Sequence, residues 1–174
     1  MLETAQKYCR WVGIEIEELR EISKEELNRR IGIVQDRLWE EELGRKTTLE
    51  LYRTWKTEMG QEDSYDGRPD STIWFRARTN CLTLGDRNRH MGGDTSCFMC
   101  GGEMEDLKHF ILDCDALNRT REKLTRLQRP RLEDWTRTLG EFLYGVEKKK
   151  SREDLMELWK ERQKRRRLWE DNRV

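Results

Sequence analysis

The sequence predicts a mostly α-helical protein, with a helical N-terminal lobe, a second helical lobe built around cysteine and histidine, and a long basic C-terminal helix. Three observations support this prediction. Apolar residues recur at spacings of three and four, and no segment shows the strict alternation that is typical of a half-buried strand. The chain also contains only two prolines, and both lie at natural breaks between predicted helices.

The first predicted helix begins at Ser23. Ser23 and Glu26 have the spacing of a capping box, in which each side chain caps a backbone N–H of the other residue. The apolar stripe of this helix consists of Leu27, Ile31, Val34 and Leu38. Thr47 and Glu50 form a second motif of the same kind, so we expect a second helix that ends at Gly60.

Residues 60–70 have the composition of a loop and are the predicted hinge between two lobes. Asp70 or Ser71 is expected to cap the helix that follows the hinge. Further on, short helices are expected over residues 116–127 and 132–139. Ser151 and Asp154 resemble a capping box at the start of the last helix. These breaks divide the chain into an N-terminal helical lobe (1–60), a domain that contains the Cys/His cluster (61–145) and a basic C-terminal helix (146–174).

The composition is unusually polar for a folded domain. Charged residues make up 40% and hydrophobic residues 34% of the 174 residues, so only modest cores can form and metal or partner contacts should matter for stability. The seven tryptophans argue against disorder. Lys and Arg total 35, as do Asp and Glu, so the net charge does not indicate nucleic-acid binding. The C-terminal segment nevertheless has a local excess of basic residues.

The chain shows no apolar run of the length that crosses a bilayer and no hydrophobic signal core at its start, so no membrane partner is expected. Its five cysteines fit metal binding in a reducing compartment better than a secreted disulfide scaffold. We therefore expect an intracellular protein, nuclear or cytoplasmic. Cys9 and Cys81 lie outside the cysteine cluster and are expected to be core residues or free thiols.

Cys97, Cys100, His109 and Cys114 carry the strongest chemical signal. Their pattern, Cys-x2-Cys-x8-His-x4-Cys, supplies three thiols and one imidazole, which is a complete tetrahedral ligand set for one structural zinc ion. Gly101 and Gly102 follow the second cysteine, where a tight turn tolerates glycine best. A closed four-ligand site has no open position for water or substrate, so the predicted zinc stabilises the fold and is not catalytic.

Other interpretations of the cysteine pair explain less of the sequence. A redox Cys-x-x-Cys leaves His109 and Cys114 without a role. A zinc deaminase needs His-x-Glu before Pro-Cys-x-x-Cys, and neither motif is present. We therefore expect no enzyme activity from this chain and no catalytic residues.

Three stretches, LYRTWKTEMG, STIWFRARTNCLTLGDRNR and CFMCGGEMEDLKHFILDC, resemble the C-terminal CCHC zinc-knuckle region of non-LTR (LINE-type) retrotransposon reverse transcriptases. The resemblance covers residues 47–117. It implies a nucleic-acid-binding role beside the polymerase core. The Tyr-x-Asp-Asp-like aspartate pair of such polymerases is absent, so the resemblance implies a C-terminal segment or a standalone protein descended from one.

Basic residues around the cysteine cluster are the candidate nucleic-acid contacts. They could form a phosphate-binding surface, or they could be solvated and paired with nearby carboxylates. The candidates are Arg76, Arg78, Arg87, Arg89, Arg119, Arg121, Lys123, Arg126, Lys164, Arg165, Arg166 and Arg167. The last four could also serve as a nuclear localisation signal.

Aromatic residues near these basic segments leave two alternatives open. Phe98 and Met99 project from the predicted knuckle turn and could contact unpaired bases or pack against Trp74 or the knuckle helix. Trp159 and Trp169 are spaced to share one helix face, where packing against another helix is the alternative to base stacking.

These observations support two functional hypotheses. The first is a zinc-stabilised nucleic-acid-binding module that binds RNA or DNA through its charge and with little base specificity. The alternative is a protein–protein interaction module, derived from a retroelement, that acts as a scaffold or a homo-oligomer without binding nucleic acid. Zero net charge and the abundance of tryptophan support the alternative.

Overall fold

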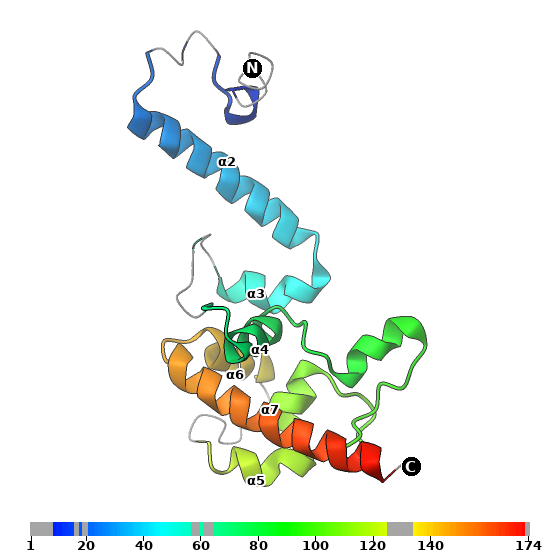
Figure 1. Cartoon of the computed structure of the whole chain (residues 1–174). Coiled ribbons are helices and arrows are strands. Elements are labelled where there is room, and N and C mark those ends of the chain that lie inside the picture. Colours follow the sequence, from blue (N-terminus) through cyan, green and yellow to red (C-terminus); the bar gives the residue numbers. More distant parts are fainter. Residues whose placement is uncertain are drawn as a thin grey trace.

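The computed structural model describes residues 9–15, 18, 21–56, 60, 65–124 and 134–172. These residues form helices and connecting loops, with no strand among them, which confirms the predicted mostly α fold. Four helices gather into one bundle: α3 (Glu50–Trp55), α4 (Pro69–Arg78), α6 (Trp135–Tyr144) and α7 (Lys148–Asp171). Helix α2 (Lys24–Gly44) projects away from this bundle (Figure 1). None of the helices in the described ranges combines the length and hydropathy that a membrane crossing requires.

Helix α2 spans Lys24–Gly44 and begins where the capping motif predicts. The hydroxyl of Ser23 accepts a hydrogen bond of 3.2 Å from the Glu26 N–H. Glu26 also pairs with Arg29 and Arg30, and these side-chain hydrogen bonds lower the pKa of Glu26 to about 2. Of the apolar stripe, only Val34 is buried, because α2 extends beyond the bundle.

The second predicted capping box is wrong. Residues 47–49 form the 3-10 turn η2 (Thr47–Leu49), and α3 (Glu50–Trp55) begins only at Glu50, without a side-chain cap. The helix also ends well before Gly60. A 3-10 turn uses the backbone groups that the capping motif was expected to satisfy.

Helix α4 spans Pro69–Arg78, and Pro69 at its first position replaces the predicted cap. Its C-terminal end is a Schellman motif: the Cys81 N–H donates to the Arg76 carbonyl and the Asn80 N–H to the Ala77 carbonyl. Asn80 has a φ of 51°, the left-handed conformation that this motif requires. The 3-10 segment η3 (Gly85–Met91) follows within the predicted loop.

Helix α6 spans Trp135–Tyr144 and is capped by the Asp134 side chain. Helix α7 spans Lys148–Asp171, so it begins before the predicted Ser151 cap. Ser151 is instead buried inside the helix. Asp154, the other residue of that motif, is also buried and pairs with Lys150 at 2.8 Å.

The core lies where α4 and α6 pack against α7. Its largest fully buried side chains include Trp74, Phe110, Ile111, Leu143, Leu155 and Leu158. At its edge, α3 approaches α6 so closely that a Cβ at Gly140 would lie 2.0 Å from the Trp55 indole ring. Glycine is therefore required at this contact. The segment 97–114, called the knuckle below, and α7 both contribute residues to this same core. The division into three domains stays a prediction.

Candidate metal centre and basic cleft

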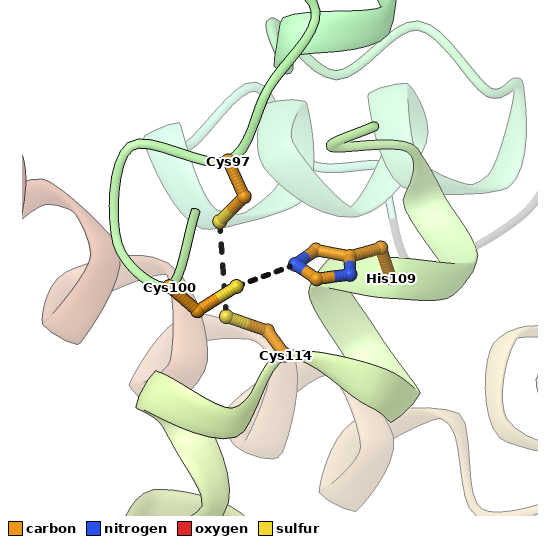
Figure 2. A group of neighbouring side chains, drawn as sticks. All are labelled: Cys97, Cys100, His109 and Cys114. Atoms are coloured by element: carbon orange, nitrogen blue, oxygen red, sulfur yellow. Dashed lines mark hydrogen bonds between the residues drawn. The ribbon is translucent and has the colours of Figure 1, made fainter. Parts of the chain in front are cut away.

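Cys97, Cys100, His109 and Cys114 converge on one point (Figure 2). One ligand atom from each residue, a sulfur or an imidazole nitrogen, lies within 4.8 Å of all the others. The Cys97 and Cys114 sulfurs are 3.8 Å apart, and the Cys100 sulfur is 3.3 Å from His109 Nε2. The cluster could hold one metal ion.

A tight turn holds the first two ligands. The Gly101 N–H donates to the Cys97 carbonyl, and the Cys97 N–H donates to the Gly102 carbonyl, each at 2.8 Å. Gly101 has a φ of 76°, which residues with a side chain rarely adopt. These contacts form the turn that the glycines predicted.

His109 begins the π-helical turn η4 (His109–Asp113), and Cys114 directly follows it. In an α-helix, residues five positions apart point about 140° away from each other. Here the Cys114 N–H donates to the His109 carbonyl at 2.7 Å, a bond across five residues that widens the turn. The wider turn brings both side chains to the same side of the backbone.

The site is buried on one side and open on the other. Cys97 and Cys114 are buried, His109 is half-buried and Cys100 is exposed. Burial raises the pKa of the Cys97 thiol, against backbone hydrogen bonds from Cys100 and Met99 that lower it. Burial and the neighbouring Cys97 and Cys100 raise the pKa of the Cys114 thiol to about 12. A bound cation would favour the thiolate forms.

The distances fit a tetrahedral ion better than a disulfide. Two thiolates on one zinc, each about 2.3 Å from it, are about 3.8 Å apart at the tetrahedral angle. The observed Cys97–Cys114 separation of 3.8 Å has this value. A disulfide would need about 2.05 Å between the sulfurs.

The knuckle packs against the end of α7. The ring centroid of Phe98 lies 5.7 Å from that of Trp169, and Trp159 meets Phe110 edge-to-face at 5.9 Å. Packing is therefore the observed role of Phe98, although its partner is α7 and not Trp74. Trp159 and Trp169 both contact the knuckle and therefore share one face of α7, as their spacing predicted.

A buried ion pair joins the knuckle to α7. The Arg162 guanidinium donates two hydrogen bonds of 2.7 Å to the carboxylate of Glu105, and the side chains are only 2–3% exposed. Arg162 also lies 5.2 Å from the ring centroids of Phe98 and Trp159. The sequence does not reveal this pair, because nothing in the local pattern distinguishes Arg162 from its many basic neighbours.

Two of the predicted nucleic-acid contacts are buried within the fold, so the expectation of a surface contact is not met there. Arg121 donates to the backbone carbonyl of Cys114 and, at 2.6 Å, to the Asn118 side chain. Arg78 donates to the Tyr65 hydroxyl at 2.7 Å and lies 4.4 Å from the Tyr144 ring centroid. Both guanidiniums are buried, where they donate hydrogen bonds to protein acceptors or pack on aromatic rings. They are therefore not available to bind phosphate at the surface.

Lys123 and Lys164 do come together. They line one cleft of about 300 Å³ between α5 (Asn118–Arg121), with the residues just after it, and α7. Lys160 lies in the same cleft, and its partner there is Glu157 at 2.7 Å. Within the described ranges, no carboxylate forms an ion pair with Lys123 or Lys164. Glu161 also lines the cleft and pairs with Arg165, so the positive charge of the cleft comes from Lys123 and Lys164.

The other candidates are dispersed. Arg165 and Arg166 pair within α7 with Glu161 and Glu170. Arg167 lines a neighbouring cleft together with Lys160 and Lys164. The remaining described candidates are exposed but do not line the cleft between α5 and α7: Arg76, Arg87, Arg89 and Arg119. Arg126 lies outside the described residues.

Comparison with known proteins does not assign the chain to a family. No family model, curated protein or solved structure matches the chain. The resemblance to retrotransposon reverse transcriptases therefore stays a prediction from the sequence. The four-residue cluster and the cleft are the features on which a function can be proposed.

Proposed function

We propose that the protein is a zinc-stabilised nucleic-acid-binding module that binds phosphates in the cleft between α5 and α7. The observation that carries the proposal is the convergence of Lys123, Lys160 and Lys164, which come from segments far apart in the chain, on one cleft. Phosphate contacts by lysine give affinity without base specificity. The resemblance to non-LTR reverse transcriptases favours RNA or DNA over other polyanions.

Zinc is the proposed ion because of the donor set. Thiolate ligands are soft and imidazole suits zinc, whereas magnesium and calcium prefer oxygen donors. All four positions of a tetrahedral ion would be taken by Cys97, Cys100, His109 and Cys114. The ion would stabilise the fold around the cleft and leave the contacts to the lysines.

The salt dependence of binding tests the proposal. A short RNA or DNA oligonucleotide should bind at low salt, and log K should fall linearly with log salt concentration. The Lys123→Ala/Lys164→Ala variant should bind more weakly, with a slope reduced by about 0.7–0.9 for each lost phosphate contact. The matched control is Lys24→Ala/Arg45→Ala, which removes the same charge from exposed positions at the two ends of α2.

Two results would contradict this function. One is the absence of binding at low salt to any single-stranded or duplex RNA or DNA. The other is an equal loss of affinity in the cleft variant and in the α2 control, since this would show that only net charge matters.

A second candidate function is self-association through α2. The observation that favours it is the projection of α2 from the bundle, with Leu27, Ile31 and Leu38 of its apolar stripe only half-buried. Helices with such apolar surface commonly pair with another helix. Sedimentation of the full chain should then depend on concentration, and Ile31→Lys, a change on the stripe, should abolish that dependence. A monomer at all concentrations excludes this function.

A further inference from the structure

We propose that the metal centre controls the basic cleft: the bound ion holds α5 against α7, and loss of the ion separates Lys123 from Lys160 and Lys164. This inference rests on the proposed function, because it concerns the regulation of the same cleft. It is carried by two buried polar contacts that lead from the knuckle to the two walls of the cleft.

The first contact fixes α5. Cys114 is a candidate ligand, and the 3-10 turn η5 (Asp115–Leu117) connects it directly to α5. The guanidinium of Arg121 reaches back from α5 to the Cys114 carbonyl and to Asn118, and the side chain is 6% exposed. The backbone of a ligand residue is thus the acceptor that anchors this wall of the cleft.

The second contact fixes α7. Glu105 lies between Cys100 and His109 in the chain, and its carboxylate holds Arg162 through two hydrogen bonds of 2.7 Å. Arg162 lies between Lys160 and Lys164 on α7. A buried carboxylate that loses its guanidinium partner is strongly unfavourable, so the knuckle and this part of α7 are coupled.

The knuckle has little regular structure of its own. From 92 to 117 the described backbone is helical only at 107–113 and in η5, so ligand bonds to an ion would supply much of its order. Helix α5 has four residues and cannot be stable in isolation, whereas α7 has 24 residues and packs on α4 and α6. Loss of the ion should therefore release α5 first and leave α7 in place.

Limited proteolysis of the full chain tests this order. Trypsin should cut after Arg121 roughly ten-fold faster when the zinc-loaded protein is treated with a chelator, because local opening exposes the α5 backbone. Cutting after Arg45, which is exposed at the end of α2, should keep its rate and serves as the internal control. Equal cutting after Arg121 with and without zinc would overturn the proposal.

A variant separates coupling from general unfolding. Arg121→Met keeps the bulk of the buried side chain but cannot donate to the Cys114 carbonyl. It should bind one zinc ion and bind a short single-stranded oligonucleotide about ten-fold more weakly. Because the variant lacks the site after Arg121, its α5 is followed by trypsin cutting after Arg119, which should be faster than in the unchanged zinc-loaded protein. Arg137→Met, an exposed change on α6 that removes the same charge and lies outside the cleft, is the matched control and should behave like the unchanged protein.

The two proposals fail in different ways. If the zinc-loaded protein does not bind the oligonucleotide at low salt, the proposed function is wrong. If it binds equally well with zinc, after chelation and as Arg121→Met, the cleft binds nucleic acid but the metal centre does not control it.

Discussion

The Arg162 guanidinium in α7 donates two hydrogen bonds of 2.7 Å to the carboxylate of Glu105, which lies 57 positions earlier in the chain. Glu105 also accepts a hydrogen bond of 3.0 Å from the Gly85 N–H. One buried carboxylate therefore joins the knuckle to α7 and to the start of η3. Most of the other ion pairs in the described ranges link exposed residues that are close in the sequence, and such pairs contribute little to stability.

Breaking this pair should destabilise the fold strongly. Arg162→Met is expected to lower the free energy of unfolding by about 3–5 kcal/mol, because it leaves the Glu105 carboxylate buried without its cation. The double variant Glu105→Leu/Arg162→Met should lose less than the sum of the two single variants, since no unpaired charge remains. Urea denaturation of all four proteins measures the coupling, and additive losses would show that the pair is not a unit.

Metal binding should need all four cluster residues. Cobalt(II) added to the reduced protein should give the absorption of a tetrahedral thiolate site at one ion per chain. Cys100→Ala and His109→Ala should each lose this absorption and melt at a lower temperature, because metal-binding free energy contributes to folding. Cys81→Ala, at a half-buried cysteine outside the cluster, should keep both properties.

Two helical glycines should respond in opposite directions to the same change. Gly140→Ala is expected to destabilise the protein by about 1–3 kcal/mol, because the new methyl group would lie 2.0 Å from the Trp55 ring. Gly32→Ala, where nothing lies within 4 Å of the added Cβ, should stabilise α2 by about 0.5–1 kcal/mol. Thermal melting distinguishes these outcomes, and a stable Gly140→Ala variant would contradict the close packing of α3 on α6.

Arg78 should matter for stability and not for nucleic-acid binding. Its guanidinium lies within 5.8 Å of the ring centroids of Tyr52, Tyr65 and Tyr144. Arg78→Lys should cost about 2 kcal/mol, because an ammonium group cannot reproduce the planar stacking and the hydrogen bond to Tyr65. The salt slope of oligonucleotide binding should stay unchanged. The exposed Arg76→Lys is the control for stability.

The contribution of Asp86 to the free energy of unfolding should become more favourable as the pH falls. Burial raises the pKa of its carboxyl group, and the charges of Asp106 and Glu105 raise it further. The folded state therefore holds this proton more tightly than the unfolded state, and the ionised form is penalised at neutral pH. Asp86→Asn should raise the melting temperature at neutral pH, and the gain should shrink as the pH falls through the raised pKa. A gain that is independent of pH would contradict this assignment.

Local patterns predicted the helices and the metal cluster well. Ser23 caps α2 as expected, since a cap depends only on residues three positions apart. The four cluster residues converge because their short spacings limit where each side chain can reach. The same reasoning misplaced Thr47 and Ser151, where η2 and an early start of α7 replace the predicted caps.

The sequence by itself determined the mostly α fold, the candidate ligand set and the basic character of the C-terminal helix, because periodicity and spacing are local properties. Only the tertiary structure decided which basic residues remain on the surface. Arg78, Arg121 and Arg162 are withdrawn into the fold by distant partners, whereas Lys123 and Lys164 meet at one cleft. Which side chains are buried depends on how the helices pack. A guanidinium can be buried only where the packing brings it to a carbonyl, a carboxylate or aromatic rings, because a buried charge without a partner is unfavourable.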